Sequence, residues 1–158
     1  MGLRARAWIV PALAWALLAV LALGLGRRDA RITASNTTAQ YTFLFLAENL
    51  VDGSTETYWI PDETPSHVDV HFRSPRTLAW VEVVNGDNLP HRSAATRALR
   101  VELFDGERRV WTADGEFTRI ATDVLRFEPR ARGDRLRVIA LSHFASLPCL
   151  SELRWGVE

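Results

Sequence analysis

Two groups of residues in this chain carry side chains that could do chemistry. Cys149 is the single cysteine and follows closely after His143, so a thiol–imidazole nucleophile is one hypothesis. His67, Asp69 and His71 alternate along a short segment and offer ligands for a transition metal. Residues four apart on a strand are about 13 Å apart, which is too far for both histidines to share one ion. We therefore interpret this segment as an outward polar strand face, and Cys149 as a small buried apolar group.

The motifs of several enzyme classes are absent from the sequence. It contains no G-x-S-x-G elbow, no G-x-G-x-x-G or P-loop, and no H-E-x-x-H. A single cysteine excludes an intrachain disulfide and a Cys-based zinc cluster. From Ile32 onward there are 14 arginines and 18 acidic residues, a net charge of −4, which argues against a nucleic-acid partner. We therefore predict a binding protein that is not an enzyme.

Residues 7–26 form an uncharged apolar segment with arginines on both sides. Twenty helical residues span about 30 Å, the thickness of the hydrocarbon core of a bilayer. The segment is either a retained transmembrane helix or the apolar part of a cleaved signal peptide, and its length favours the anchor. We expect residues 1–28 to be this anchor or signal peptide and residues 29–158 to be a separate domain. The domain would be membrane-anchored outside the cytoplasm, or secreted.

The rest of the chain has the alternating pattern of β-strands. Alternating or β-branched segments occur at His67–Phe72, Leu78–Val84, Leu99–Leu103, Val110–Trp111, Leu136–Ala140 and Leu153–Val157. Asp105-Gly106 predicts a hairpin turn between two of them, because glycine accepts a positive φ. Pro, Gly, Asn and Asp separate the segments, and no amphipathic helix of three turns interrupts them. The pattern predicts seven or eight short strands in an all-β sandwich or jelly roll.

Several short motifs follow one another in a distinctive order. They are Ala34-Ser35-Asn36, Asn49-Leu50-Val51-Asp52-Gly53, Thr57-x-Trp59, a strand–proline–strand segment around Pro75, and Ser151-Glu152-Leu153. In this order they resemble the discoidin or F5/8 type C domain, a galactose-binding-like family. The run Pro148–Leu153, with Asn85-Gly86 and Arg97, looks most like its NADase-type glycan-binding branch. The resemblance implies a discoidin-like jelly-roll β-sandwich, here preceded by one N-terminal hydrophobic helix.

The resemblance also implies a structural calcium ion beside the Asp52-Gly53 loop. Calcium is held by six to eight oxygen atoms. Asp52 and Glu152 would each supply a carboxylate, Thr57 a hydroxyl and a carbonyl, and Asn49 a neighbouring carbonyl. The alternative is a metal-free Asx turn at Asp52, with Glu152 on a solvated face. Trp59 follows the loop and is expected to pack in the core.

Ligand-binding residues of the family lie on loops at one end of the sandwich. Three segments of this chain qualify: Tyr41–Phe45, Asn88–Arg92 and His143–Phe144. If they converge, Asn88, His91 and Arg92 would supply hydrogen bonds, and Tyr41 or Phe144 would supply a stacking face for a sugar. The alternatives are that residues 41–45 pack inward, that residues 88–92 form an ordinary solvated loop, or that an apolar loop contacts a membrane or a protein.

These observations predict a non-catalytic binding module at the cell surface or secreted, which recognises carbohydrate through these loops. The alternative is a structural or protein-interaction module of the bacterial envelope that has no sugar ligand and binds an envelope protein. In both cases the N-terminal helix would provide the contact with the membrane.

Overall fold

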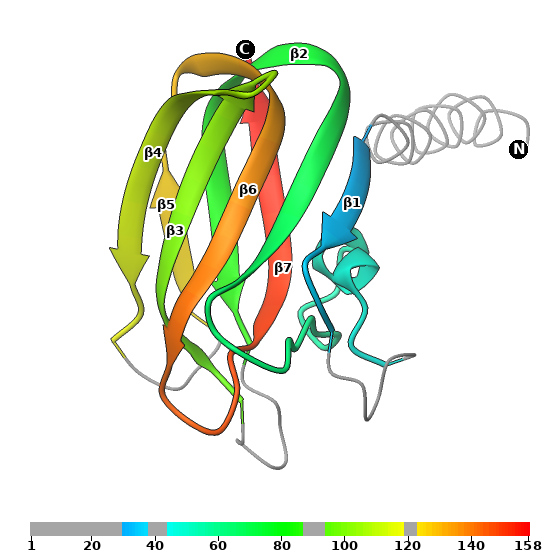
Figure 1. Cartoon of the computed structure of the whole chain (residues 1–158), viewed down its shortest axis with the longest axis vertical. Helices are drawn as coiled ribbons and strands as arrows, with labels where there is room; N and C mark the ends of the chain where they lie inside the picture. Colours follow the sequence, from blue (N-terminus) through cyan, green and yellow to red (C-terminus); the bar gives the residue numbers. More distant parts are fainter. Residues whose placement is uncertain (1–29, 38–43, 87–93, 119–122) are drawn as a thin grey trace, which may run out of the picture. The chain divides into compact units, whose positions relative to one another are not determined.

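The computed structural model describes residues 30–37, 44–86, 94–118 and 123–158, and Arg31–Glu158 form one compact unit. The elements of the described residues are β1 (Ala30–Ala34), the 3₁₀ helix η2 (Ala47–Val51), β2 (Ser66–Asn85), β3 (Thr96–Asp105), β4 (Arg108–Glu116), β5 (Val124–Phe127), β6 (Ala131–His143) and β7 (Leu150–Val157) (Figure 1). None of the helices in these ranges is long and apolar enough to cross a membrane. The predicted anchor or signal peptide, residues 1–28, lies outside the described residues.

Strand β2 belongs to both layers of the sandwich. Its first half, from Ser66 to His71, pairs antiparallel with β6. Its second half, ending at Asn85, pairs with β7 and with β5. The register shifts between His71 and Arg76, around Pro75, which has no N–H to donate to a ladder. The sequence predicts two strands separated by this proline, and the structure shows one strand of 20 residues that passes from one layer to the other.

The strand order β1-β2-β6-β3-β4 makes the larger layer, and β5 and β7 flank the second half of β2 in the smaller layer (Figure 1). Alternate side chains of β2, β3 and β6 point between the layers and are fully buried. They include Val68, Val70, Val81, Val83, Leu99, Val101, Leu103, Leu136 and Val138. Trp59 is 0% exposed, so its expected place in the core is confirmed. The predicted all-β sandwich is therefore present.

The predicted hairpin is also present. β3 and β4 pair antiparallel on either side of the turn, and Gly106 has φ +60°, a conformation that glycine adopts without strain. The sequence does not predict β1 or β5. Both are short strands, of five and four residues, in which alternation is too brief to give a signal.

The outer face of the larger layer differs from the solvated polar face that the sequence predicts. Asp69 is only 7% exposed, because arginines from β6 cover it. Arg137 donates two hydrogen bonds of 2.7 Å to its carboxylate, and Arg135 lies 3.6 Å from the same carboxylate. Burial alone would raise the pKa of Asp69, but the hydrogen bonds and charge of Arg137 outweigh it, so the pKa is lowered. Both guanidinium groups lie over the ring of Phe104, at 4.3 and 5.6 Å from its centroid.

His67 lies at the edge of this charged face and makes folding pH-dependent. Its burial lowers its pKa, as does the charge of Arg137. The unfolded chain therefore binds a proton more readily than the folded chain, so stability is complete above about pH 6.5 and falls as the pH drops below that value. We expect the stability of the His67→Gln variant to depend less on pH in this range. The measurement is the urea midpoint of unfolding at several pH values between 5 and 8. His71→Gln, on the same strand, is the control, and an unchanged slope in His67→Gln would contradict the assignment.

Candidate functional site

The described residues on either side of residues 87–93 are fixed to the segment between β6 and β7. The N–H of Gly86 donates to the carbonyl of Cys149 at 3.1 Å, and the N–H of Ala95 donates to the carbonyl of Leu147 at 3.0 Å. Phe144 in turn donates its N–H to the carbonyl of Ala95 at 3.0 Å. We call this end of the sandwich, formed by Gly86, Ala94–Arg97 and residues 143–149, the loop end.

A buried polar network makes the loop end rigid. The amide of Asn85 donates to the carbonyl of Thr96 at 3.0 Å and accepts from the N–H of Thr96 at 3.1 Å. The hydroxyl of Thr96 donates to the carbonyl of Cys149 and accepts from its N–H, at 3.0 and 3.1 Å. Ser151 donates its hydroxyl to the carbonyl of Asn85 at 3.1 Å. These side chains are all 0% exposed, so their hydrogen bonds are protected from competing water.

A small apolar cluster lies beside this network. Ile60, Ala94 and Cys149 are buried together, and Phe45, Tyr58 and Leu147 pack against them. Cys149 is 0% exposed, as expected for a buried apolar group, and Nδ1 of His143 is bonded instead to the carbonyl of Ala145 at 2.6 Å. The structure therefore gives no support to a Cys149–His143 nucleophile.

Phe144 is the one predicted ligand residue within the described ranges, and it lies at the loop end. The other four, Tyr41, Asn88, His91 and Arg92, lie outside the described residues. The Phe144 ring is half-buried, and the guanidinium of Arg97 lies 5.8 Å from its centroid. Arg97 donates from Nε to Glu116 at 2.8 Å, and both charged side chains are more than half exposed, at 56% and 59%. An aromatic ring, a guanidinium and a carboxylate therefore stand together on an accessible surface.

In the sequence, Arg97 is recognisable only as part of a motif, and Glu116 gives no signal of its own. The signal that could have found the pair is the hairpin turn at Gly106. Arg97 and Glu116 lie almost equally far from that turn along β3 and β4, so antiparallel pairing brings them together.

The residues predicted to hold calcium also come together. Asp52 accepts hydrogen bonds of 2.7 Å from the N–H of Ser54 and from the hydroxyl of Thr57. Glu152, on β7, accepts from the N–H of Gly53 at 3.1 Å. Asn49 donates from Nδ2 to the carbonyls of Leu44 and Tyr58, at 2.7 Å each, and so braces the loop. Glu152 is only 3% exposed, so it does not lie on a solvated face as the metal-free alternative assumed.

The donor set around this loop suits a hard cation. Asp52, Thr57 and Glu152 present only oxygen atoms, which calcium prefers. No cluster of three His, Cys, Asp or Glu side chains that could hold a metal occurs in the described parts of the chain, so backbone carbonyls would have to complete the shell. The hydrogen bonds also form an Asx turn at Asp52 that holds the loop without an ion.

The chain matches no protein-family model and no curated protein. Its fold is nevertheless found in solved structures. The family 32 carbohydrate-binding module of NanJ from Clostridium perfringens, solved with galactose, is 12% identical with a TM-score of 0.66, covering 82% of this chain and 94% of that chain. A putative chitobiase fragment from Bacteroides thetaiotaomicron is 16% identical with a TM-score of 0.71, covering 83% and 90%. An F5/8 type C domain from Bacteroides fragilis is 13% identical with a TM-score of 0.64, covering 82% and 91%. This chain therefore has the discoidin-like fold of family 32 carbohydrate-binding modules and F5/8 type C domains.

Proposed function

We propose that this chain is a non-catalytic module that recognises carbohydrate at the loop end. The observation that carries the proposal is the group formed by Phe144, Arg97 and Glu116. Sugars combine apolar C–H faces, which stack on aromatic rings, with hydroxyl groups that both donate and accept hydrogen bonds. A guanidinium paired with a carboxylate serves both roles. The galactose bound by the structurally similar NanJ module supports this choice of ligand class.

The rigidity of the loop end favours binding. The network of Asn85, Thr96 and Cys149 fixes the backbone before a ligand arrives, so little ordering is needed on binding. The predicted residues Tyr41, Asn88, His91 and Arg92 would add hydrogen bonds and a second stacking face, and their roles stay predictions. We place the module at the cell surface or in the secreted fraction, with residues 7–26 as its anchor or signal.

We expect Phe144→Ala to weaken glycan binding by about tenfold, the effect of losing a stacking contact of about 1 to 1.5 kcal/mol. The measurement is a glycan array followed by titration calorimetry with the strongest ligand, using the full chain. Phe127→Ala is the matched control, because Phe127 is a partly buried aromatic residue packed against Trp111 on other strands. An array without a signal for the native chain, or equal affinities of the two variants, would refute the proposal.

Exposed leucines favour a second candidate function, an interaction module that binds an envelope protein. Leu44 and Leu46 are 50% and 39% exposed on either side of Phe45. Apolar side chains at an accessible position can contact a protein partner. A silent glycan array together with recovery of one envelope protein, lost in Leu44→Ser, would favour this function over sugar recognition.

We also propose that Asp52, Thr57 and Glu152 hold a structural calcium ion that ties the first loop to β7. Calcium at about 100 times its dissociation constant would stabilise the native chain by about 2.7 kcal/mol. For this domain size, the thermal midpoint should rise by about 10 °C when calcium replaces a chelator. Glu152→Gln should abolish the shift, whereas Glu48→Gln, at an exposed position on η2, should retain it. Equal thermal midpoints of the native chain in calcium and in chelator would contradict the calcium site. They would show that the hydrogen-bonded Asx turn holds the loop without an ion.

A further inference from the structure

The end of the sandwich that lies opposite the loop end is rich in arginine. β2 bends there between its two halves, and Arg73 and Arg76 lie on the bend. Thr77, just after the bend, pairs with Arg132 at the start of β6, so these two segments lie side by side. From here β6 runs for 13 residues to His143 at the loop end, about 40 Å away.

The chain enters the domain at this same end. Ser35 donates its N–H to the carbonyl of His67 at 2.8 Å, and the hydroxyl of Thr33 lies 3.2 Å from Nε2 of His71. β1 therefore runs antiparallel to the first half of β2, and its start lies toward the bend (Figure 1). The proposed anchor, residues 7–26, precedes β1 in the sequence and is therefore joined to the domain at this end.

Among the described residues, four arginines at this end have no ionic partner. Arg31, Arg73 and Arg132 are exposed and form no ion pair within those ranges. Arg76 forms none either: its guanidinium lies over the ring of Phe72, 4.9 Å from the centroid, and its Nε is buried without a hydrogen-bond partner. We call these four arginines the arginine end. Their guanidinium groups are available to an anion from outside the chain.

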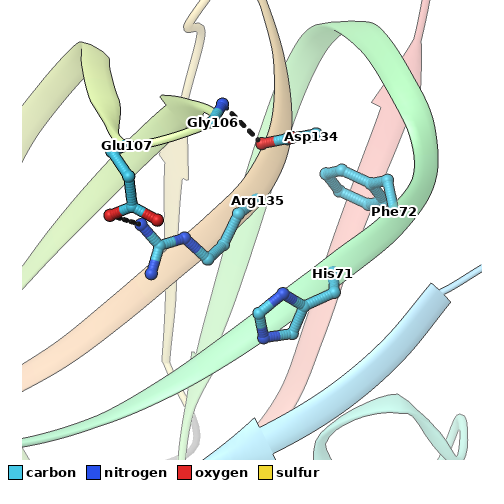
Figure 2. Close-up of a pocket in the computed structure, with 6 residues that line it drawn as sticks. All are labelled: His71, Phe72, Gly106, Glu107, Asp134 and Arg135. Carbon is cyan, nitrogen blue, oxygen red and sulfur yellow. Dashed lines mark hydrogen bonds and ion pairs between the residues drawn. The ribbon is translucent and has the colours of Figure 1, made fainter.

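Acidic side chains near this end neutralise it only in part. Figure 2 shows Glu107, on the turn between β3 and β4, facing Arg135 at 3.8 Å. Asp134 accepts a hydrogen bond of 3.1 Å from the backbone of the same turn. Both carboxylates are therefore engaged by groups outside the arginine end. Two further exposed acids, Asp105 and Glu158, offset only part of the four positive charges.

We infer that the arginine end docks on the anionic lipid headgroups of the bilayer that holds the proposed anchor. Guanidinium groups match the geometry of phosphate, and basic side chains near a bilayer are attracted to anionic lipids. The chain from Ile32 onward has a net charge of −4, so its other faces are repelled by the same surface. The loop end would then face away from the bilayer, where glycans can reach it. This inference rests on the proposed anchor and adds a partner and an orientation to the proposed function.

The test uses the full chain in vesicles of phosphatidylcholine, alone or mixed with phosphatidylglycerol, that contain a lipid with a nitroxide on its headgroup. A fluorophore is attached at Ser74→Cys, an exposed position between Arg73 and Arg76, or at Ser146→Cys, an exposed position at the loop end. Cys149 is 0% exposed and stays unlabelled. The nitroxide should quench the Ser74→Cys label strongly in the anionic vesicles and weakly in phosphatidylcholine, and should quench the Ser146→Cys label weakly in both. High salt should reduce the strong signal, because it screens surface charges.

An arginine variant tests whether charge causes the docking. Arg132→Gln, in the Ser74→Cys background, should lower the ratio of docked to undocked chain about fivefold, the expected effect of one arginine near an anionic surface. Arg154→Gln is the matched control and should leave the ratio unchanged. Arg154 is also exposed and forms no ion pair in the described parts of the chain, but it lies opposite Glu82 within β7 and outside the arginine end.

Three results would overturn the inference: equal quenching of the Ser74→Cys label in the two lipid mixtures, equal quenching at the two labelled positions, or an unchanged ratio in Arg132→Gln. Extraction of the chain from the vesicles by alkaline carbonate would refute the anchor and the inference with it. A chain that is retained in the vesicles but not quenched would refute the inference alone. Sugar recognition at the loop end is tested separately by the glycan array, so its failure is distinguishable from these results.

Discussion

Gly86→Ala will lower the free energy of unfolding by about 2 to 3 kcal/mol, the upper range for inserting a methyl group into a packed core. A β-carbon at this position would lie 2.1 Å from Sγ of Cys149, which belongs to the rigid loop end, and 3.1 Å from Cδ1 of Tyr58, which packs against the apolar cluster beside it. The displacement would also disturb the hydrogen bond from Gly86 to Cys149, so glycan binding should fall with stability. Urea denaturation measures the first effect and calorimetric titration the second.

A double-mutant cycle provides the control for Gly86→Ala. Cys149→Ala removes the sulfur atom that the new methyl group would meet, so the double variant should recover part of the loss. A positive coupling between the two sites would show that the clash, and not a general effect of alanine on the backbone after β2, causes the destabilisation. Full stability of Gly86→Ala, or strictly additive effects, would contradict this account of the loop end.

Asp69→Asn will destabilise the domain by about 3 kcal/mol, because removing one partner of a buried ion pair leaves the other charge uncompensated. Arg137 would lose the carboxylate to which it donates two hydrogen bonds, and Arg135 would keep only its ion pair with the exposed Glu107. The ion pair forms only while Asp69 is ionised. Because its folded pKa is lowered, this stability is present above about pH 3.9 and disappears as the pH falls through the folded value.

Asp114→Asn is the matched control for the buried pair. Asp114 forms a bidentate pair with Arg100 of the same geometry, at 2.6 and 3.0 Å, but its side chain is 61% exposed. Water screens an exposed pair of this kind, so its loss should change the stability far less than the loss of the Asp69 pair. Urea midpoints of the two variants at pH 7 measure the difference, and equal losses would show that burial of Asp69 does not determine its effect.

The strands of the core could be predicted from the sequence because their alternation is regular. Val68, Val70, Leu99 and Val101 mark inward faces directly. The passage of β2 between the layers could not be predicted, since a proline between two apolar segments is compatible with either a loop or a bend. The burial of Asp69 could not be predicted from the sequence either. The arginines that cover it come from β6, and the pairing of β6 with β2 is a long-range contact.

For the candidate sites as well, some features could be predicted from the sequence and others could not. Asp52, Thr57 and Glu152, which were named from short motifs, lie close together in the structure, and Phe144 lies at the loop end; their roles stay predictions. The partnership of Arg97 with Glu116 depends on the register of a hairpin, which is a property of two strands together.

The central claim, sugar recognition at the loop end, is tested most directly by following backbone amides of the full chain while galactose is added. The account predicts saturable shifts of Ala95, Arg97, Glu116 and Phe144, which are lost in Phe144→Ala and retained in Phe127→Ala. If these amides do not move with galactose or with any saccharide that the array identifies, while the chain remains folded, the loop end is not a sugar-binding site.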